Sequence, residues 1–198
     1  MDAALSRSSE PLEISPAESL SVLAQVLLAL RSTTDLGTSC AIAGASAVRL
    51  LEAAEYRLLR VDGRSGALRA LDESGVETSY LAENDGPVDR VMRFESPLFD
   101  GGAGDENRET GLWPRTPGAL ITAPLLAGGL VQGVLLVAFD GPRAFNATDR
   151  LFILTVAAAL AITLEREELR RFLRDERQRA GRLEQRSNAA SYRLRRLH

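Results

Sequence analysis

Residues 118–164 constrain the fold of this chain more than any other segment, because they predict a hairpin that leads into a helix. Two apolar runs flank the pair Gly128-Gly129, and a connection this short joins neighbouring antiparallel strands. After a polar segment, Asn146 can cap a helix that has Asp149 in its first turn. The following positions predict the stripe of that helix that faces the core: Leu151, Leu154, Ala158 and Ile162.

The N-terminal half predicts two helices, after a lead over 1–14 that we expect to be disordered. Ser15 as cap, Pro16 at the first helical position and Glu18 in a capping box mark the first helix start. This helix carries a seam suited to packing on another helix, made of Leu20, Leu23, Leu27 and Leu30. A second helix, from Thr34 or Asp35 to about Leu51, is rich in small residues that permit close packing against a sheet.

The middle of the chain predicts three strands and a less regular connection. The strands are expected over 54–61, 67–71 and 76–81, with a turn at 62–66 between the first two. A short helix over 87–93 and a flexible loop over 100–107 follow. The last two strands, over 119–126 and 130–139, then complete a sheet before the final helix begins.

Beyond Glu165 the final helix becomes charged, but a seven-residue repeat continues and predicts a coiled coil over 165–198. Gly181 weakens it by roughly 1 kcal/mol. Three positions of the repeat are polar, namely Arg166, Glu176 and Ser187. The apolar positions of the repeat are Ile162, Leu169, Leu173, Ala180, Leu183, Ala190, Leu194 and Leu197.

Composition excludes several kinds of chemistry. All 24 basic residues are arginine, so Schiff-base chemistry and a phosphate-loop lysine are excluded. His198 is the only histidine, which leaves no general base or metal ligand of that type inside the domain. Cys40 is the only cysteine, and its small neighbours predict that it is buried rather than redox-active. We therefore expect no enzyme, no metal and no cofactor, and we interpret the acidic loop near Asp105 as solvated.

Charge and hydropathy also bear on location and partners. Residues 163–198 contain 11 arginines and 6 acidic residues, so this tail has a net charge of +5. The whole chain has a net charge of −3, and the remainder therefore carries −8. Because the acidic residues are interspersed and Tyr192 is the only aromatic near the basic end, we expect a solvated coiled-coil surface rather than nucleic-acid binding. The longest uncharged stretch there, 151–164, is too short to cross a bilayer, and no signal peptide is evident, so we expect a cytoplasmic protein.

Residues 15–168 resemble a GAF domain, a small sensory module of signalling proteins, most specifically over 54–71 and 119–164. The resemblance implies an α+β fold, related to PAS domains, with a central antiparallel sheet of five to six strands, N-terminal helices and a long C-terminal helix. We set the domain at 15–164. The lysine-containing signature of GAF domains that bind cyclic nucleotides is absent. The cysteines of bilin-binding and methionine-sulfoxide-reducing relatives, and the histidine of haem-binding ones, are also missing where they would be needed.

In GAF domains the variable middle segment roofs the ligand cavity. The resemblance therefore implies that an anionic or planar ligand, if there is one, would meet Arg90, Arg93, Trp113 and Arg115. The alternative is that Trp113 fills this cavity itself.

Two functions follow as expectations. The first is a regulatory sensory module that forms a homodimer through its first and last helices and signals through the last. It would act on a partner or on an output domain of a longer protein. The second is a ligand-free structural adaptor that dimerises and docks a partner through the coiled coil.

Overall fold

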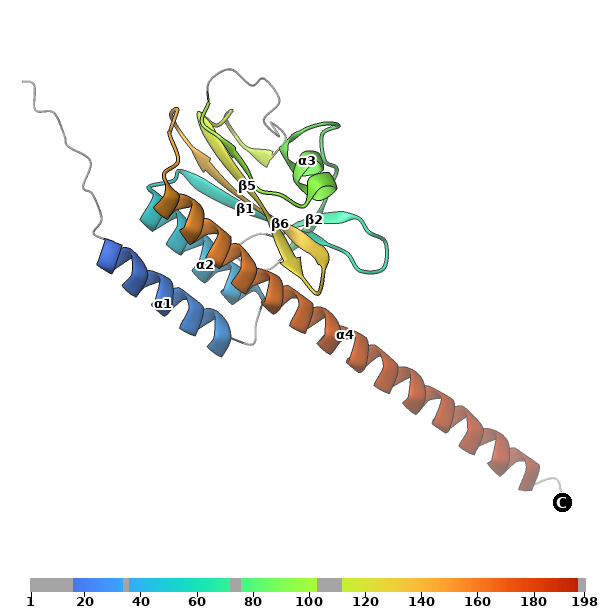
Figure 1. The fold of residues 1–198 in the computed structure, drawn as a ribbon. Helices are drawn as coiled ribbons and strands as arrows, with labels where there is room; N and C mark the ends of the chain where they lie inside the picture. The colour runs from blue at the N-terminus through green and yellow to red at the C-terminus, as the bar shows by residue number, and fades with distance from the viewer. Residues whose placement is uncertain (1–15, 34–35, 72–75, 103–111, 196–198) are drawn as a thin grey trace, which may run out of the picture.

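The computed structural model describes residues 16–33, 36–71, 76–102 and 112–195, with side chains from Leu20 to Arg182 (Figure 1). The predicted lead over 1–14 and the first residues of the predicted second helix, Thr34 and Asp35, lie outside these ranges. The elements are α1 (Pro16–Ser32), α2 (Leu36–Leu51), β1 (Glu55–Val61), β2 (Leu68–Leu71), β3 (Glu77–Tyr80), α3 (Pro87–Phe94), β4 (Leu98–Asp100), β5 (Ala119–Ala127), β6 (Leu130–Phe139) and α4 (Ala147–Arg195).

The strands form one six-stranded sheet in the order β3-β2-β1-β6-β5-β4, and every neighbouring pair is antiparallel. This confirms the predicted α+β class and the expected number of strands. The predicted strand ranges agree with β1, β2, β3, β5 and β6 to within a residue or so at each end. Strand β4 was not predicted, because three residues that follow Pro97 are too few to show an alternating pattern.

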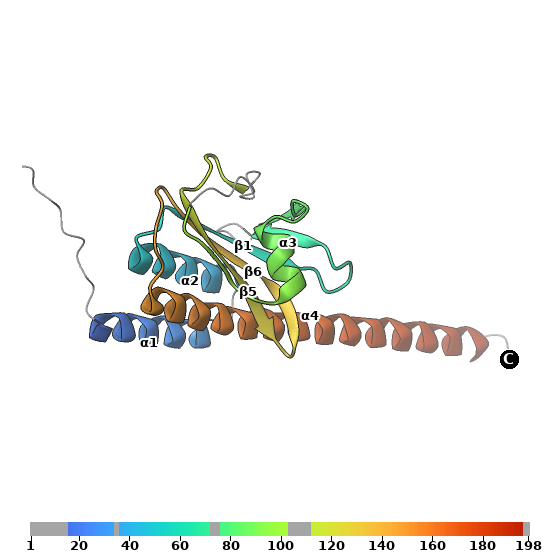
Figure 2. The same cartoon turned by 45° about the horizontal axis from the view of Figure 1, so that its top comes forward.

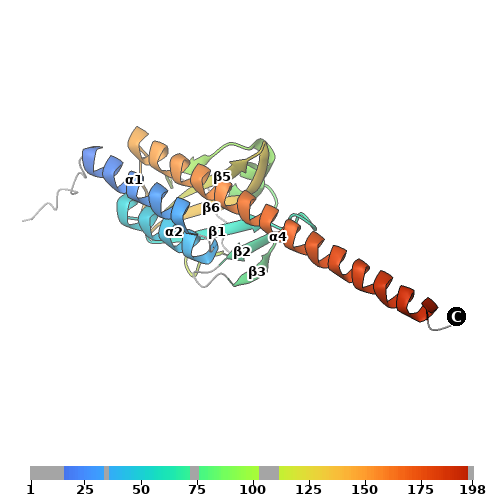
Figure 3. The same ribbon diagram turned by 90° about the horizontal axis from the view of Figure 1, so that it is seen from below.

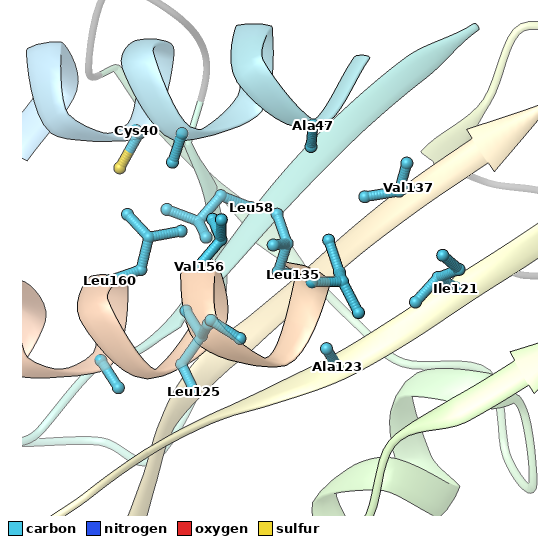
Figure 4. Packing of buried hydrophobic residues seen from close by; sticks show 14 of the residues in the cluster. Cys40, Ala47, Leu58, Ile121, Ala123, Leu125, Leu135, Val137, Val156 and Leu160 are labelled. Carbon is cyan, nitrogen blue, oxygen red and sulfur yellow. The ribbon is translucent and has the colours of Figure 1, made fainter. Parts of the chain in front are cut away.

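Three helices cover one face of the sheet and the short α3 covers the other (Figures 1 and 2). On the three-helix face, α2 packs on β1, α4 packs on β5 and β6, and α1 rests on α2 and α4. Cys40 of α2, Leu58 of β1 and Leu160 of α4 meet in the core between these layers (Figure 4). The last half of α4 continues beyond the sheet, as Figure 2 shows.

The small residues of α2 allow it to lie close to the sheet, as their abundance predicted. Ala43 and Ala47 are fully buried, and a Cβ added at Gly44 would overlap the ring of Tyr56. Bulk at this position therefore displaces either the Tyr56 ring or α2 itself.

A Gly44→Val substitution is expected to lower the free energy of unfolding by about 1–3 kcal/mol, because the added methyls overpack this contact. Urea denaturation followed by circular dichroism measures the change. The matched control is Ala45→Val, at an exposed position of the same helix, which carries the same β-branched penalty without the contact. Equal losses in the two variants would show that the Gly44–Tyr56 approach is unimportant.

Two reciprocal hydrogen bonds set the beginning of α4. The backbone N–H of Asp149 donates to Asn146 Oδ1 at 2.9 Å, and the N–H of Asn146 donates to Asp149 Oδ2 at 3.2 Å. This confirms Asn146 as the cap. Arg143 pairs with the same carboxylate at 3.3 Å and lies over the Phe139 ring at 4.9 Å, so the end of β6 holds the helix start.

The stretch Ala147–Arg182 of α4 is long and apolar enough to cross a membrane by composition. Half of its most apolar window is buried inside the domain, however, where it packs on the sheet. The core of the domain thus accounts for the hydropathy of this helix.

Candidate functional site

A line of exposed apolar side chains runs along α4 from its first turn to the part beyond the sheet. Leu151, Ile162 and Leu169 each leave about 60% of their surface exposed. The prediction that Leu151, Leu154, Ala158 and Ile162 face the core is therefore wrong, since all of these side chains are exposed. The core is filled from the opposite side of α4, by Phe152, Ile153, Val156, Ala157, Leu160, Ala161 and Leu164.

Further along α4, Phe172 and Leu173 are exposed as well. The structure describes the side chains of four predicted apolar positions of the repeat, and all four are exposed: Ile162, Leu169, Leu173 and Ala180. Leu183, Leu194 and Leu197 lie outside the described side chains. Exposed apolar side chains in one line along a helix are typical of a helix–helix interface.

Helix α1 lies beside the first half of α4 and runs in the same direction (Figure 3). Its predicted seam is divided. Leu30 is buried in the domain's own core, Leu23 and Leu27 are half-buried, and Leu20 is exposed. Leu30 therefore cannot contribute to an intersubunit surface, whereas Leu28, outside the predicted seam, is exposed and can. The seam is divided because α1 buries one side against α2 and α4, and only its other side is available to a second copy.

A cluster of charged side chains lies between the β1–β2 hairpin and α4. We call it the Arg60 cluster; it comprises Arg60, Arg64, Glu77, Glu168, Arg171 and Asp175. These residues line a cleft of about 740 Å³. This cluster was not predicted from the sequence, because its members come from β1, β3, α4 and the β1–β2 turn and share no local motif.

The turn at one side of this cleft is rigidly built around Asp62. The backbone N–H groups of Arg64 and Ser65 donate to Asp62 Oδ1 at 3.0 Å each. These hydrogen bonds hold the pKa of the Asp62 carboxyl well below its usual range. The carboxylate therefore stays charged and accepts a hydrogen bond from Arg69 at 3.3 Å.

The opposite face of the sheet is packed by the domain's own side chains. Leu59, Leu120 and Leu136 of the sheet meet Val88 and Val91 of α3 in a second buried cluster, which Trp113 joins. This is where the resemblance placed a ligand cavity. Trp113 takes part in the packing of this face.

A smaller pocket of about 250 Å³ opens beside Trp113. Its lining combines the Trp113 and Phe139 side chains with Arg115, Glu55 and Asp140. The Arg57 guanidinium lies 5.2 Å from the centre of the Trp113 ring, a cation–π contact. The Trp113 Nε1 is buried and has no acceptor among the described residues.

Of the four predicted ligand residues, Trp113 and Arg115 therefore share one pocket, whereas Arg90 and Arg93 do not line it. Both of these arginines lie on α3, where Arg93 pairs with Asp89 and lies 3.6 Å from Asp85. In the described part of the chain, no group of three His, Cys, Asp or Glu residues is arranged to hold a metal. Cys40 is buried in the core of the domain, as expected.

No protein-family model matches the chain. No curated protein matches it either. Solved structures do. The GAF domain of a phosphoenolpyruvate-protein phosphotransferase from Coxiella burnetii has a TM-score of 0.67 at 16% identity, over 79% of this chain and 98% of that one.

Two further structures share the arrangement. The GAF domain of a putative sensor histidine kinase from Pseudomonas syringae has a TM-score of 0.56 at 17% identity, over 81% of this chain and 94% of that one. Free methionine-R-sulfoxide reductase from Neisseria meningitidis, solved with its substrate, has a TM-score of 0.59 at 20% identity, over 75% and 89%. The antiparallel sheet, its helices and these similarities together show that this chain has the fold of a GAF domain, followed by a long C-terminal helix.

Proposed function

We propose that this protein is a regulatory, GAF-like module of signal transduction that forms a homodimer through α1 and α4. The observation that carries the proposal is the line of exposed apolar side chains on α4, with Leu20 and Leu28 on α1 beside it. A monomer leaves this surface in water, and a second copy with the same surface covers it. A parallel pairing of two copies brings both α4 extensions together as a coiled coil.

In this proposal, binding of a ligand or partner at the domain changes the packing of α4, which transmits the change to an output partner or domain. GAF domains of a sensor histidine kinase and of a phosphotransferase, which share the fold, are compatible with such a role. We further propose that the module is cytoplasmic and acts by binding rather than by catalysis. A buried single cysteine does not supply the several thiols of a methionine sulfoxide reductase.

A structural adaptor without a ligand is the second candidate. Its support is the face of the sheet under α3, where Trp113 and the apolar side chains of the sheet and of α3 pack on one another. In that case the domain is a dimerisation platform, and α4 docks a partner protein.

Native mass spectrometry of the freshly purified chain tests both candidates. A dimer with an additional small-molecule mass supports the sensory module. A dimer without added mass supports the adaptor. A monomer at micromolar concentration contradicts the homodimer in either form.

The pocket beside Trp113 yields a separate prediction for the sensory module. Trp113→Ala is expected to abolish a thermal shift produced by a bound ligand, because the ring forms one wall of the pocket. Differential scanning fluorimetry with a library of small organic anions and planar compounds measures the shift. Arg93→Ala, at an exposed position outside the pocket, serves as control. A ligand whose shift is the same in Trp113→Ala binds elsewhere.

A further inference from the structure

We propose that the Arg60 cluster sets the rotational position of α4 on the sheet, and so determines which side of its projecting half faces a second copy of the chain. The first part of this inference concerns contacts within one copy. The second part rests on the homodimer proposed above.

Arg60 is a charged residue in a position that a core residue would ordinarily occupy. Side chains alternate along β1, so Arg60 shares the face of Leu58, which packs in the core with α4. Only 8% of the Arg60 side chain is exposed. A buried guanidinium is tolerated where carboxylates compensate its charge.

The compensating carboxylates come from two different elements. Arg60 Nη2 lies 2.9 Å from Glu77 Oε1 of β3, and Nη1 lies 3.1 Å from Glu168 Oε2 of α4. The third donor, Nε, has no acceptor among the described residues. A rotation of α4 that removed Glu168 would therefore leave a buried arginine with one carboxylate instead of two.

Outer contacts extend the same side of α4 along the sheet edge. Arg171 lies 3.7 Å from the Glu77 carboxylate, and Asp175 pairs with Arg64 of the β1–β2 turn. At the same turn, a Cβ added at Gly63 would overlap the Glu168 carboxylate, which shows how closely the hairpin approaches the helix. Glu168, Arg171 and Asp175 are spaced by three and four residues, so they form one row on α4.

This row lies on another side of α4 than the exposed apolar line. With 3.6 residues per turn, Glu168 and Asp175 are turned by roughly 100–140° from Ile162 and Leu169. The row continues the buried side of the helix that includes Leu164. The cluster and a dimer partner can therefore hold α4 at the same time, each from its own side.

The consequence is a division of roles along one helix. The apolar line provides attraction to a second copy, but apolar contacts are not directional and tolerate rotation. The Arg60 cluster adds the directional constraint, since ion pairs with a buried arginine require particular side chains to stay in place. Binding events that disturb the β1–β2 turn would act on the rotation of α4 through these pairs.

Disulfide cross-linking between copies tests the inference in the full chain with Cys40→Ala. Single cysteines replace Leu169 or Leu173 on the apolar line. In a second set they replace Arg170 or Arg174, which are the next residues in the chain and lie about 100° around the helix from the line. Disulfide formation requires Cα atoms within about 4.4–6.8 Å, so cross-linking on the line is expected to be about tenfold faster than off it. In an Arg60→Met/Glu77→Met variant this preference is expected to fall below about threefold, because α4 can then rotate.

Methionines in both positions keep the fold testable, since apolar replacement of a whole buried ion pair is often neutral for stability. Arg179→Met is the matched control; Arg179 pairs at 2.7 Å with Glu176 of the same helix, so its loss removes a charge but no tie to the sheet. A cross-linking preference that is retained in Arg60→Met/Glu77→Met, or that is lost equally in Arg179→Met, overturns the proposal.

A second measurement separates this proposal from the homodimer. Should every cysteine variant fail to cross-link and light scattering give a monomer, the homodimer is wrong, and the cluster is then examined by amide hydrogen exchange of residues 166–180. An increase in the exchange rate of about tenfold in the double methionine variant, relative to Arg179→Met, supports the proposal that the Arg60 cluster fixes the position of α4. Unchanged exchange overturns it.

Discussion

An Ile162→Glu variant is expected to be monomeric at concentrations at which the wild-type chain is a dimer. Ile162 is 60% exposed, near the middle of the apolar line on α4, so the substitution places a carboxylate from each copy in the proposed interface. Loss of apolar burial on both sides and enclosure of two like charges together cost about 3–5 kcal/mol per dimer. Because each 1.4 kcal/mol changes Kd tenfold, Kd should rise by roughly a hundred- to several thousand-fold.

Size-exclusion chromatography with light scattering over a dilution series measures this change. The folded monomer should keep its circular dichroism spectrum, because Ile162 makes no part of the buried core. Leu81→Glu is the matched control, since Leu81 is an exposed leucine in the segment after β3, away from α1 and α4. Retention of the dimer in Ile162→Glu would place the interface elsewhere.

Truncation of Leu160 to alanine is expected to lower the free energy of unfolding by about 2–5 kcal/mol. Leu160 is fully buried between α4 and the sheet, two residues before the exposed Ile162 (Figure 4). Removal of its side chain leaves a cavity in the core between α4 and the sheet, which a sheet held by neighbouring strands cannot collapse to fill.

Urea denaturation in the Ile162→Glu background measures the loss without a contribution from dimer dissociation. Leu81→Ala in the same background is the control, and its effect should stay within about 0.5 kcal/mol, as for other exposed positions. Comparable effects at Leu160 and Leu81 would mean that α4 buries a different side from the one described.

The architecture was predictable because its signals are local. The Gly128-Gly129 connection, the apolar runs around it and the Asn146 cap each depend on a few consecutive residues, and the structure confirms all three. The same holds for the small residues of α2. Strand β4 was not predicted because three residues are too few to show the alternation of a strand.

The side of α4 that enters the core was not predictable in the same way. Residues 151–164 are apolar or small on nearly every side, so several stripes of 3.6-residue period fit them equally well. The stripe through Leu151 and Ile162, which was predicted to face the core, is one of these. Docking on β5 and β6 selected another, through Phe152 and Leu160, and left the first exposed.

Part of the candidate site was predictable from the sequence, and part was not. Trp113 and Arg115 line the same pocket because only one residue separates them at the approach to β5. Arg90 and Arg93 face other neighbours because α3 directs them there. Arg60 and Glu168 are 108 positions apart in the chain, so no local sequence pattern predicts their pairing.

The sequence by itself determined every strand except β4, the hairpin of β5 and β6 and the long C-terminal helix, because backbone hydrogen bonding and side-chain periodicity are decided over a few residues. Only the tertiary structure decided which side of α4 is buried, that Leu30 belongs to the core, and that a buried arginine of β1 holds the helix. These outcomes depend on competition among surfaces that meet only after the chain has folded, where close packing admits one arrangement among several of similar hydrophobicity.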